Sequence, residues 1–294
     1  MSGERRTAVV VSRDPEVVRA VGASLEAAGL VIEQLDTPPL PGRISGETTA
    51  VIVVDREARE AAGEALRTYG APVIVVGDDL DDDGLVALML DAPVSHAISD
   101  PADRSVEITG EKLASGDLFG LEKYLDGDTT VLQRRVTTDG ERRFVTDEIC
   151  AWAETAGARR SLLHRIRSTV DELLMNALHD TPINPEGPSA VLRWAHDGGT
   201  LAISVGDTSG AIVQRDIIDN VRRARASRGR PRDSSPAIPR QGAGLGLYLV
   251  MANVASLIVN VERGRRTEVV CLFDLKAGAR QSVAAPRALH VFAQ

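Results

Sequence analysis

Short, continuous apolar runs alternate with longer polar or amphipathic stretches in the first part of this chain. The runs cover residues 6–12, 50–54 and 73–76, with a weaker one at 94–99. Each run has the length of a buried strand. Residues 14–29, between the first two runs, begin with an acidic cap and a proline and end at a glycine, which predicts an amphipathic helix. Strands and helices that alternate in this way predict a doubly wound parallel α/β sheet.

The second half contains a long amphipathic segment, residues 161–180. Its apolar residues recur at spacings of three and four, which predicts a helix with one buried stripe. The stripe consists of Leu162, Ile166, Val170, Leu173 and Ala177. Glu172 and Asn176 lie four residues apart on this helix, so their side chains project from one face. An amide oxygen can ligate Mg²⁺ and a carboxylate can deprotonate or orient a hydroxyl, so the pair suits a nucleotide site.

A glycine-rich segment that runs directly into an apolar stretch follows far downstream, beginning Gly242-AGLGLYLVM. Bare backbone N–H groups at the start of a helix form an anion site that fits phosphates. Between this segment and the long helix lies Asp207-Thr-Ser-Gly210. A helix with this pair of residues or a glycine loop is a weak signal by itself, but the combination in this order is more specific.

The three segments together resemble the GHKL (Bergerat-fold) ATPases, which include histidine kinases, gyrase B, heat-shock chaperones and the serine kinases that act as anti-sigma factors. Glu172-LLM-Asn176-Ala is similar to the N box of that family. The resemblance implies a two-layer α/β sandwich that binds ATP and Mg²⁺. In that fold Asn176 would hold the metal, and Glu172 would be the catalytic base.

The same resemblance assigns the remaining residues of the nucleotide site. Asp207 corresponds to the acid that binds the adenine amino group, and Thr267 corresponds to a threonine that supports this acid from a late strand. The second glycine box would comprise Gly242, Gly244, Leu245 and Gly246. The first glycine box departs from the family, which has glycines two and four residues after the acid. Here those positions are Ser209 and Ala211, and Gly210 lies between them. Residues 211–241, which are rich in arginine, would form the ATP lid and either clamp phosphates or remain a solvated loop.

The first half resembles a response-regulator receiver domain, with Asp55 at the position of the phosphoacceptor. Phosphoryl transfer to a carboxylate needs a metal and cations to offset charge. The acidic pair that holds the metal is replaced by Ser12 and Arg13, and the conserved hydroxyl and lysine positions carry Gly77 and Asp100. These departures predict a pseudo-receiver with an inert Asp55. Its function would be a docking surface, or the fold would be retained for stability.

The patterns divide the chain into a receiver-like domain at 1–115, a linker helix at 116–129 and an ATP-binding domain at 130–294. The second domain is expected to contain a helix from residue 147, a hairpin at 190–205, and a tail that adds an edge strand or meets a partner.

Composition restricts the function classes. The net charge of −8 argues against a nucleic-acid or membrane-surface role, because both need basic patches. No apolar run suits a signal peptide or a bilayer span, which favours a cytoplasmic protein. The two cysteines, Cys150 and Cys271, lie in apolar stretches and are expected to be buried free thiols.

Residues 97–163 contain no histidine, which disfavours a histidine kinase with its acceptor on a preceding helix. The helix arrangement is closest to the anti-sigma serine kinases, and this likeness implies a Ser/Thr protein kinase that acts on a partner protein. A homodimer is also implied by the resemblance. The alternative is a non-catalytic, ATP-dependent interaction switch, which the altered first glycine box and the inert pseudo-receiver favour.

Overall fold

A computed structural model describes residues 6–40, 42–77, 84, 88, 94–180, 189–210, 249–276 and 288–294 of the chain. The chain divides into two compact units. The first comprises Met1–Leu118 with Arg287–His290, and the second comprises Phe119–Pro286 with Val291–Gln294. No helix in the described ranges combines the length and the apolar composition needed to span a membrane.

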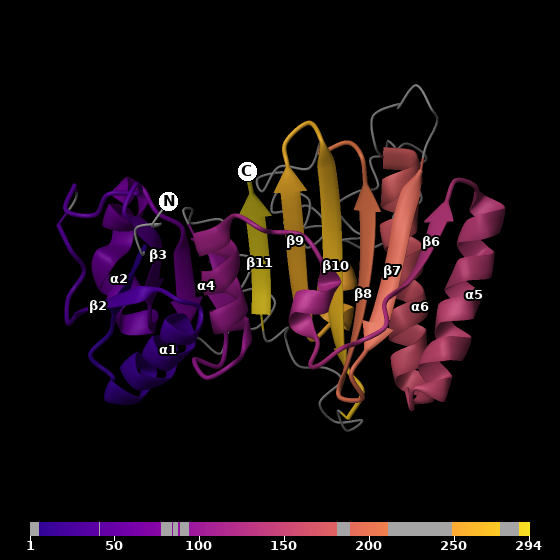
Figure 1. Cartoon of the computed structure of the whole chain (residues 1–294), viewed down its shortest axis with the longest axis horizontal. Coiled ribbons are helices and arrows are strands. Elements are labelled where there is room, and N and C mark those ends of the chain that lie inside the picture. The colour runs from indigo at the N-terminus through magenta and orange to yellow at the C-terminus, as the bar shows by residue number, and fades with distance from the viewer. Residues whose placement is uncertain are drawn as a thin grey trace, which may run out of the picture. The chain divides into compact units, whose positions relative to one another are not determined.

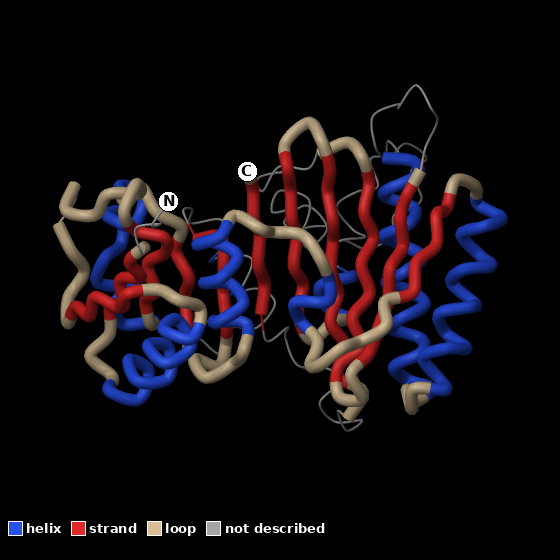
Figure 2. Tube along the Cα trace, viewed as in Figure 1, coloured by secondary structure: helices blue, strands red, loops and turns tan. Residues whose placement is uncertain are grey.

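The first unit contains a parallel sheet, as expected for this part of the sequence (Figures 1 and 2). Its strands are β1 (Thr7–Val11), β2 (Val31–Leu35), β3 (Thr49–Val54), β4 (Val73–Val76) and β5 (Val94–Ile98). Strands β3 and β4 are buried along their whole length, which their continuous apolar sequences predict. Strand β2 was not expected from the sequence. It lies at the end of the strand order and is largely exposed, so polar residues interrupt its apolar pattern.

Two long helices of the first unit, α1 (Pro15–Ala27) and α4 (Ser105–Ser115), pack against its sheet. Two shorter ones, α2 (Arg56–Ala62) and the 3₁₀ helix η1 (Gly63–Thr68), follow β3 in the chain. The predicted cap of α1 is confirmed, because the Asp14 carboxylate accepts a hydrogen bond from the Glu16 N–H at 2.8 Å. Apolar side chains from the sheet and both long helices form one cluster that includes Val10, Val21, Leu25 and Val106.

The second unit contains an antiparallel sheet and two long helices. Its strands are β6 (Leu132–Val136), β7 (Ala190–His196), β8 (Thr200–Asp207), β9 (Ser256–Glu262) and β10 (Arg266–Asp274). The helices are α5 (Asp139–Thr155) and α6 (Arg160–Met175), and a π-helical turn, η3 (Asn176–Asp180), continues α6. Residues 249–253 are also helical. Both cysteines are buried free thiols, as predicted.

Helix α5 begins eight residues before the predicted start at residue 147. The reason is a capping box, in which the Thr138 hydroxyl accepts from the Glu141 N–H at 3.2 Å and the Glu141 carboxylate accepts from the Thr138 N–H at 3.2 Å. The polar first turns that follow this box carry no apolar periodicity. The start of the helix is therefore decided by its cap, and a search for apolar spacing misses it.

Residues 119–129, here called the strap, cross one face of the second unit's sheet (Figures 1 and 2). Only Leu121–Tyr124 form a helix, the short 3₁₀ helix η2, so the predicted linker helix over 116–129 is wrong. The Glu268 carboxylate accepts hydrogen bonds from the Gly120 N–H at 2.9 Å and from the Asn260 side chain at 3.1 Å. Burial and the nearby charge of Glu268 raise the pKa of Tyr124 well above its usual value. Buried polar contacts therefore fix the strap to the sheet.

The tail forms the last strand, β11 (Ala288–Ala293), so the strand predicted there is confirmed. Its first residues pair antiparallel with β5 in the first unit. At its end, the Gln294 N–H donates to the Val261 carbonyl of β9 at 3.0 Å in the second unit. Within the first unit the strand order is β2-β1-β3-β4-β5, and within the second it is β9-β10-β8-β7-β6.

Two buried histidines lie side by side in the first unit. The Nδ1 atoms of His96 on β5 and His290 on β11 are 3.3 Å apart, and the Thr109 hydroxyl lies 3.3 Å from the same His290 atom. Burial, together with the charge of buried Lys112, lowers the pKa of His290 to about 3. Burial first, then His290 and Lys112, lower the pKa of His96 well below its usual value.

We expect acid to destabilise the first unit through these histidines. In the unfolded chain a histidine binds a proton below pH about 6.5, whereas folded His290 stays neutral down to about pH 3. The stability is therefore complete above pH about 6.5 and falls as the pH drops from there toward 3. At pH 5 the loss from His290 is about 2 kcal/mol, and His96 adds to it. Urea unfolding at pH 7 and pH 5, followed by amide NMR signals of β3, measures this loss.

The control for this measurement is an exposed histidine in the second unit. His290→Gln should reduce the loss between pH 7 and pH 5, whereas His164→Gln, on the exposed side of α6, should leave it as in the wild type. An unchanged pH dependence in His290→Gln would show that the buried pair does not cause the acid sensitivity.

Candidate nucleotide site

Asp207 and Thr267 lie directly opposite each other on neighbouring strands. Asp207 is the last residue of β8, Thr267 is the second residue of β10, and their Cα atoms are register partners. The Thr267 side chain is 2 % exposed, and its hydroxyl has no hydrogen-bond partner among the described residues. A buried hydroxyl without a partner costs about 1–3 kcal/mol, so each such group needs an explanation, of which a bound ligand or water is one.

The Asp207 carboxylate has capacity for a further hydrogen bond. Its Oδ1 atom accepts from the Ser209 N–H at 2.7 Å and from the Ser209 hydroxyl at 2.5 Å. Within the described part of the chain, no hydrogen bond reaches the other oxygen, Oδ2. An acceptor oxygen beside an unpartnered hydroxyl matches the donor and acceptor atoms of an adenine edge and a bridging water. The residues present therefore fit the adenine end of the expected ligand.

Both residues lie on the helix-covered face of the sheet. Side chains alternate along a strand, so Ile203 shares the face of Asp207, and Trp194 is its partner on β7. The Trp194 ring meets that of Trp152 on α5 edge to face, with centroids 6.5 Å apart. The strap contacts Glu268, the neighbour of Thr267, on the opposite face. The strap thus crosses one face of this sheet, and the helices lie on the other face together with Asp207 and Thr267.

Glu172 lies on α6, and Asn176 follows directly after the end of that helix. Both are half-buried, and the Asn176 N–H donates to the Glu172 carbonyl, which keeps the two side chains one turn apart as predicted. Both α6 and η3 contact β8, the strand that carries Asp207. Asn176 is the first residue of the π-helical turn. π-Helical turns are rare, and many occur at functional sites.

Ion pairs hold α6 in place against α5. The Arg142 guanidinium, 12 % exposed, contacts the Asp171 carboxylate and lies 3.1 Å from that of Asp139. Arg167 pairs with Asp147 at 2.6 Å. Asp171 is the residue before Glu172, so these contacts fix the turn of the helix that carries the expected base.

Gly210 has a structural role that the sequence did not predict. Its φ is +56°, and a Cβ atom at this position would lie 2.2 Å from the carbonyl oxygen of Glu262, the last residue of β9. Its own carbonyl accepts a hydrogen bond from the Gly264 N–H at 3.2 Å. Only glycine fits this close backbone approach. A glycine next to a predicted strand end, followed later by a glycine turn, is the only sequence sign of it.

The predicted phosphate loop lies outside the described residues. This applies to Gly242, Gly244, Leu245, Gly246 and the arginine-rich segment 211–241. Their approach to Asn176 therefore stays a prediction, as do Mg²⁺ binding by Asn176 and the role of Glu172 as base. In the described ranges no cluster of three or more His, Cys, Asp or Glu side chains is arranged to hold a metal ion.

Asp55 in the first unit acts as a helix cap. Its Oδ1 accepts from the Ala58 N–H at 2.7 Å at the start of α2, and its Oδ2 accepts from the Ser12 hydroxyl. Ser12 stands where the receiver resemblance expects a metal-binding acid. Both carboxylate oxygens are therefore engaged in structural hydrogen bonds, while the inert pseudo-receiver stays a prediction.

No family model matches the chain, and no curated protein matches it. Among solved structures, the chain is similar to one from the SiaB-SiaC complex of Pseudomonas aeruginosa. The two are 17% identical, and the match covers 48% of this chain and 88% of that chain with a TM-score of 0.35.

Proposed function

We propose that the second unit binds ATP with Mg²⁺ and transfers a phosphoryl group to a serine or threonine of a partner protein. The observation that carries the proposal is the buried, unpartnered hydroxyl of Thr267 directly opposite Asp207. A single unsatisfied hydroxyl beside a carboxylate oxygen is the pair of groups that a purine edge and its bridging water would satisfy.

Each residue then has a definite task. Asp207 accepts a hydrogen bond from the adenine amino group, and Thr267 donates to a water that the two groups share. The side-chain oxygen of Asn176 would hold the metal, which would offset the negative charge of the phosphates. The Glu172 carboxylate takes the proton of the acceptor hydroxyl, whose oxygen forms a bond to the γ-phosphorus of ATP as the bond to the leaving ADP breaks.

The acceptor is proposed to lie on another protein. The structure places His179 of η3 beside Asp139, with Nε2 3.3 Å from the carboxylate, where it holds η3 against the start of α5. His164 is exposed on the helix that carries Glu172. Neither histidine lies on a separate helix before the ATP domain, which is where a histidine kinase carries its acceptor.

The second candidate function is a non-catalytic, ATP-dependent interaction switch. The seating of Gly210 on the β9–β10 turn favours it, because the chain at the start of the expected lid is fixed by a backbone contact. A fixed backbone at Gly210 suits slow turnover, with the bound nucleotide acting by ordering a partner surface.

Calorimetric titration of Mg-ATP into wild type and Thr267→Val tests the site. The substitution removes the hydroxyl and keeps the side-chain shape, so we expect affinity to fall about tenfold. We also expect the ligand-free protein to be more stable by about 1 kcal/mol, since an unsatisfied buried hydroxyl is removed. Opposite changes in affinity and stability distinguish a ligand-binding hydroxyl from a structural one.

Ser204→Ala is the matched control. Ser204 also lies on β8, is 1 % exposed, and has a hydroxyl without a described hydrogen-bond partner, but it points to the face that the strap crosses. It should change stability without changing ATP affinity. Equal ATP affinity in Thr267→Val and wild type, or no ATP binding at all, would refute the site.

A further inference from the structure

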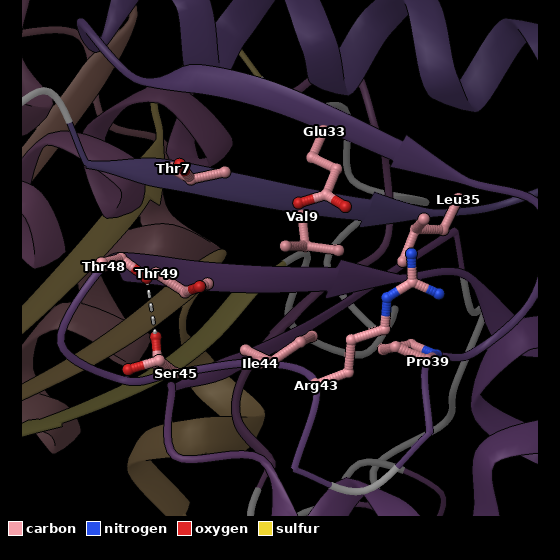
Figure 3. A pocket seen from close by; sticks show the side chains of 10 residues that line it. All are labelled: Thr7, Val9, Glu33, Leu35, Pro39, Arg43, Ile44, Ser45, Thr48 and Thr49. Carbon is pink, nitrogen blue, oxygen red and sulfur yellow. Dashed lines mark hydrogen bonds between the residues drawn. The ribbon is translucent and has the colours of Figure 1, made fainter.

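A small cavity of about 160 Å³ lies in the first unit between the sheet and residues 42–48. Val9 of β1 and Leu35 of β2 line it from the sheet, and Ile44 lines it from the loop (Figure 3). None of these residues belongs to the expected nucleotide site or to the Asp55 position. The cavity therefore has no role in the function proposed above.

The outer wall of the cavity is fixed before any ligand arrives. The Tyr69 hydroxyl donates to the Pro39 carbonyl at 2.6 Å, and the Thr49 N–H donates to the Ser45 carbonyl at 2.9 Å. Gly46 packs so closely on the backbone of Gly70 that a Cβ atom would lie 2.1 Å from the Gly70 carbonyl oxygen. A cavity with walls held in this way is preorganised, which reduces the entropic cost of binding.

The cavity is lined by one carboxylate and one guanidinium. Figure 3 shows Glu33 extending from β2 toward Val9, and Arg43 extending from the loop toward Leu35. Among the described residues neither Glu33 nor Arg43 forms an ion pair. Opposite charges on separate walls, left unpaired, match a molecule that carries both an ammonium and a carboxylate group.

A hydroxyl completes the set of polar groups. Thr49 is 6 % exposed and lines the cavity, so its hydroxyl can form a hydrogen bond to a ligand there. Thr7 adds a second hydroxyl to the same wall.

We propose that this cavity binds a small zwitterionic α-amino acid of six or seven non-hydrogen atoms. An engineered cavity of about 150 Å³ accommodates benzene, which has six such atoms, so alanine or serine matches the available volume. The ammonium group would face Glu33, the carboxylate would face Arg43, and Thr49 would hydrogen-bond to the ligand. The first unit would thereby be a ligand-sensing module in place of a phosphorylated receiver.

Saturation-transfer NMR with the full chain and L-alanine or L-serine tests this proposal. Given the small size of the ligand and the exposure of both charges, we expect a Kd on the order of 1 mM. Propionate lacks the ammonium group and ethylammonium lacks the carboxylate, so each should bind at least about tenfold more weakly. At ten times the Kd, the amino acid should shift the unfolding equilibrium of the first unit about 11-fold toward the folded state.

Three variants locate the site. Glu33→Gln, Arg43→Gln and Thr49→Val should each weaken amino-acid binding about tenfold, whereas Arg19→Gln on the exposed face of α1 should not. Circular dichroism of each variant verifies that the fold is retained. The proposal is overturned if neither amino acid shows saturable binding, if propionate binds as tightly as alanine, or if all three variants bind as the wild type does. The test is independent of ATP, so the nucleotide site and this site can fail separately.

Discussion

Glu172→Gln should lower phosphoryl transfer from ATP to a co-purified partner protein by about 10²- to 10⁴-fold. The amide keeps the size of the side chain and its neighbours but cannot take a proton from the acceptor hydroxyl. Because the base acts in the chemical step and not in nucleotide binding, calorimetric affinity for Mg-ATP should change little. Labelled ATP, purified protein and partner, with single-turnover rates, measure the chemical step directly.

The control for this experiment is Glu154→Gln, an exposed acid on α5 that contacts none of the proposed site. It should transfer phosphate as the wild type does. Equal transfer by Glu172→Gln and wild type would rule out the assigned base while leaving the nucleotide site intact. ATP binding without any transfer in the wild type, together with nucleotide-dependent partner affinity, would favour the interaction switch.

Elements whose residues carry a strong local pattern could be predicted from the sequence. Strands β3 and β4 are unbroken apolar runs, and α1 has both a cap and a terminal glycine, so local rules suffice for them. Helix α6 shows its buried stripe at helical spacing, and the Glu172–Asn176 pair therefore lies one turn apart as expected. In each case the deciding interaction is within the element or with a generic apolar core.

The features that were missed depend on distant parts of the chain. Strand β2 has polar residues and exists because β1 offers it a free edge. The strap takes its path from Glu268, which lies 148 residues after Gly120. The first residues of β11 pair with β5, which lies almost two hundred residues earlier in the chain. No local pattern in the tail or in residues 116–129 encodes such partners.

In the candidate site, too, some features could be predicted from the sequence and others depend on distant parts of the chain. Asp207 and Thr267 were assigned through a family resemblance, and the register of β8 and β10 now places them opposite each other. The orphaned hydroxyl that supports the assignment is a property of three-dimensional burial, which the sequence does not state. Gly210 was assigned to the nucleotide through the same resemblance, yet its surroundings explain a glycine without any ligand.

Gly210→Ala should destabilise the second unit by about 3 kcal/mol. Holding a non-glycine residue in the left-handed region costs about 1–2 kcal/mol, and crowding against the Glu262 carbonyl adds about 1–3 kcal/mol. Gly198→Ala is the matched control, because its φ is +89° but no atom lies within 4 Å of the added Cβ. It should lose only the backbone term, about 1 kcal/mol. Urea unfolding followed by tryptophan fluorescence reports on this unit, which holds both tryptophans, Trp152 and Trp194.

The same variant separates the two functions proposed for this chain. If the backbone contact of Gly210 anchors the start of the expected lid, its loss should lower stability and, by freeing the lid, change how tightly nucleotide is held. Gly210 could instead serve only as a glycine-box residue that allows a phosphate to approach. In that case Gly210→Ala should weaken ATP binding, and its urea midpoint should equal that of Gly198→Ala. The second outcome would contradict the structural role, and with it the observation that favours a switch over a kinase.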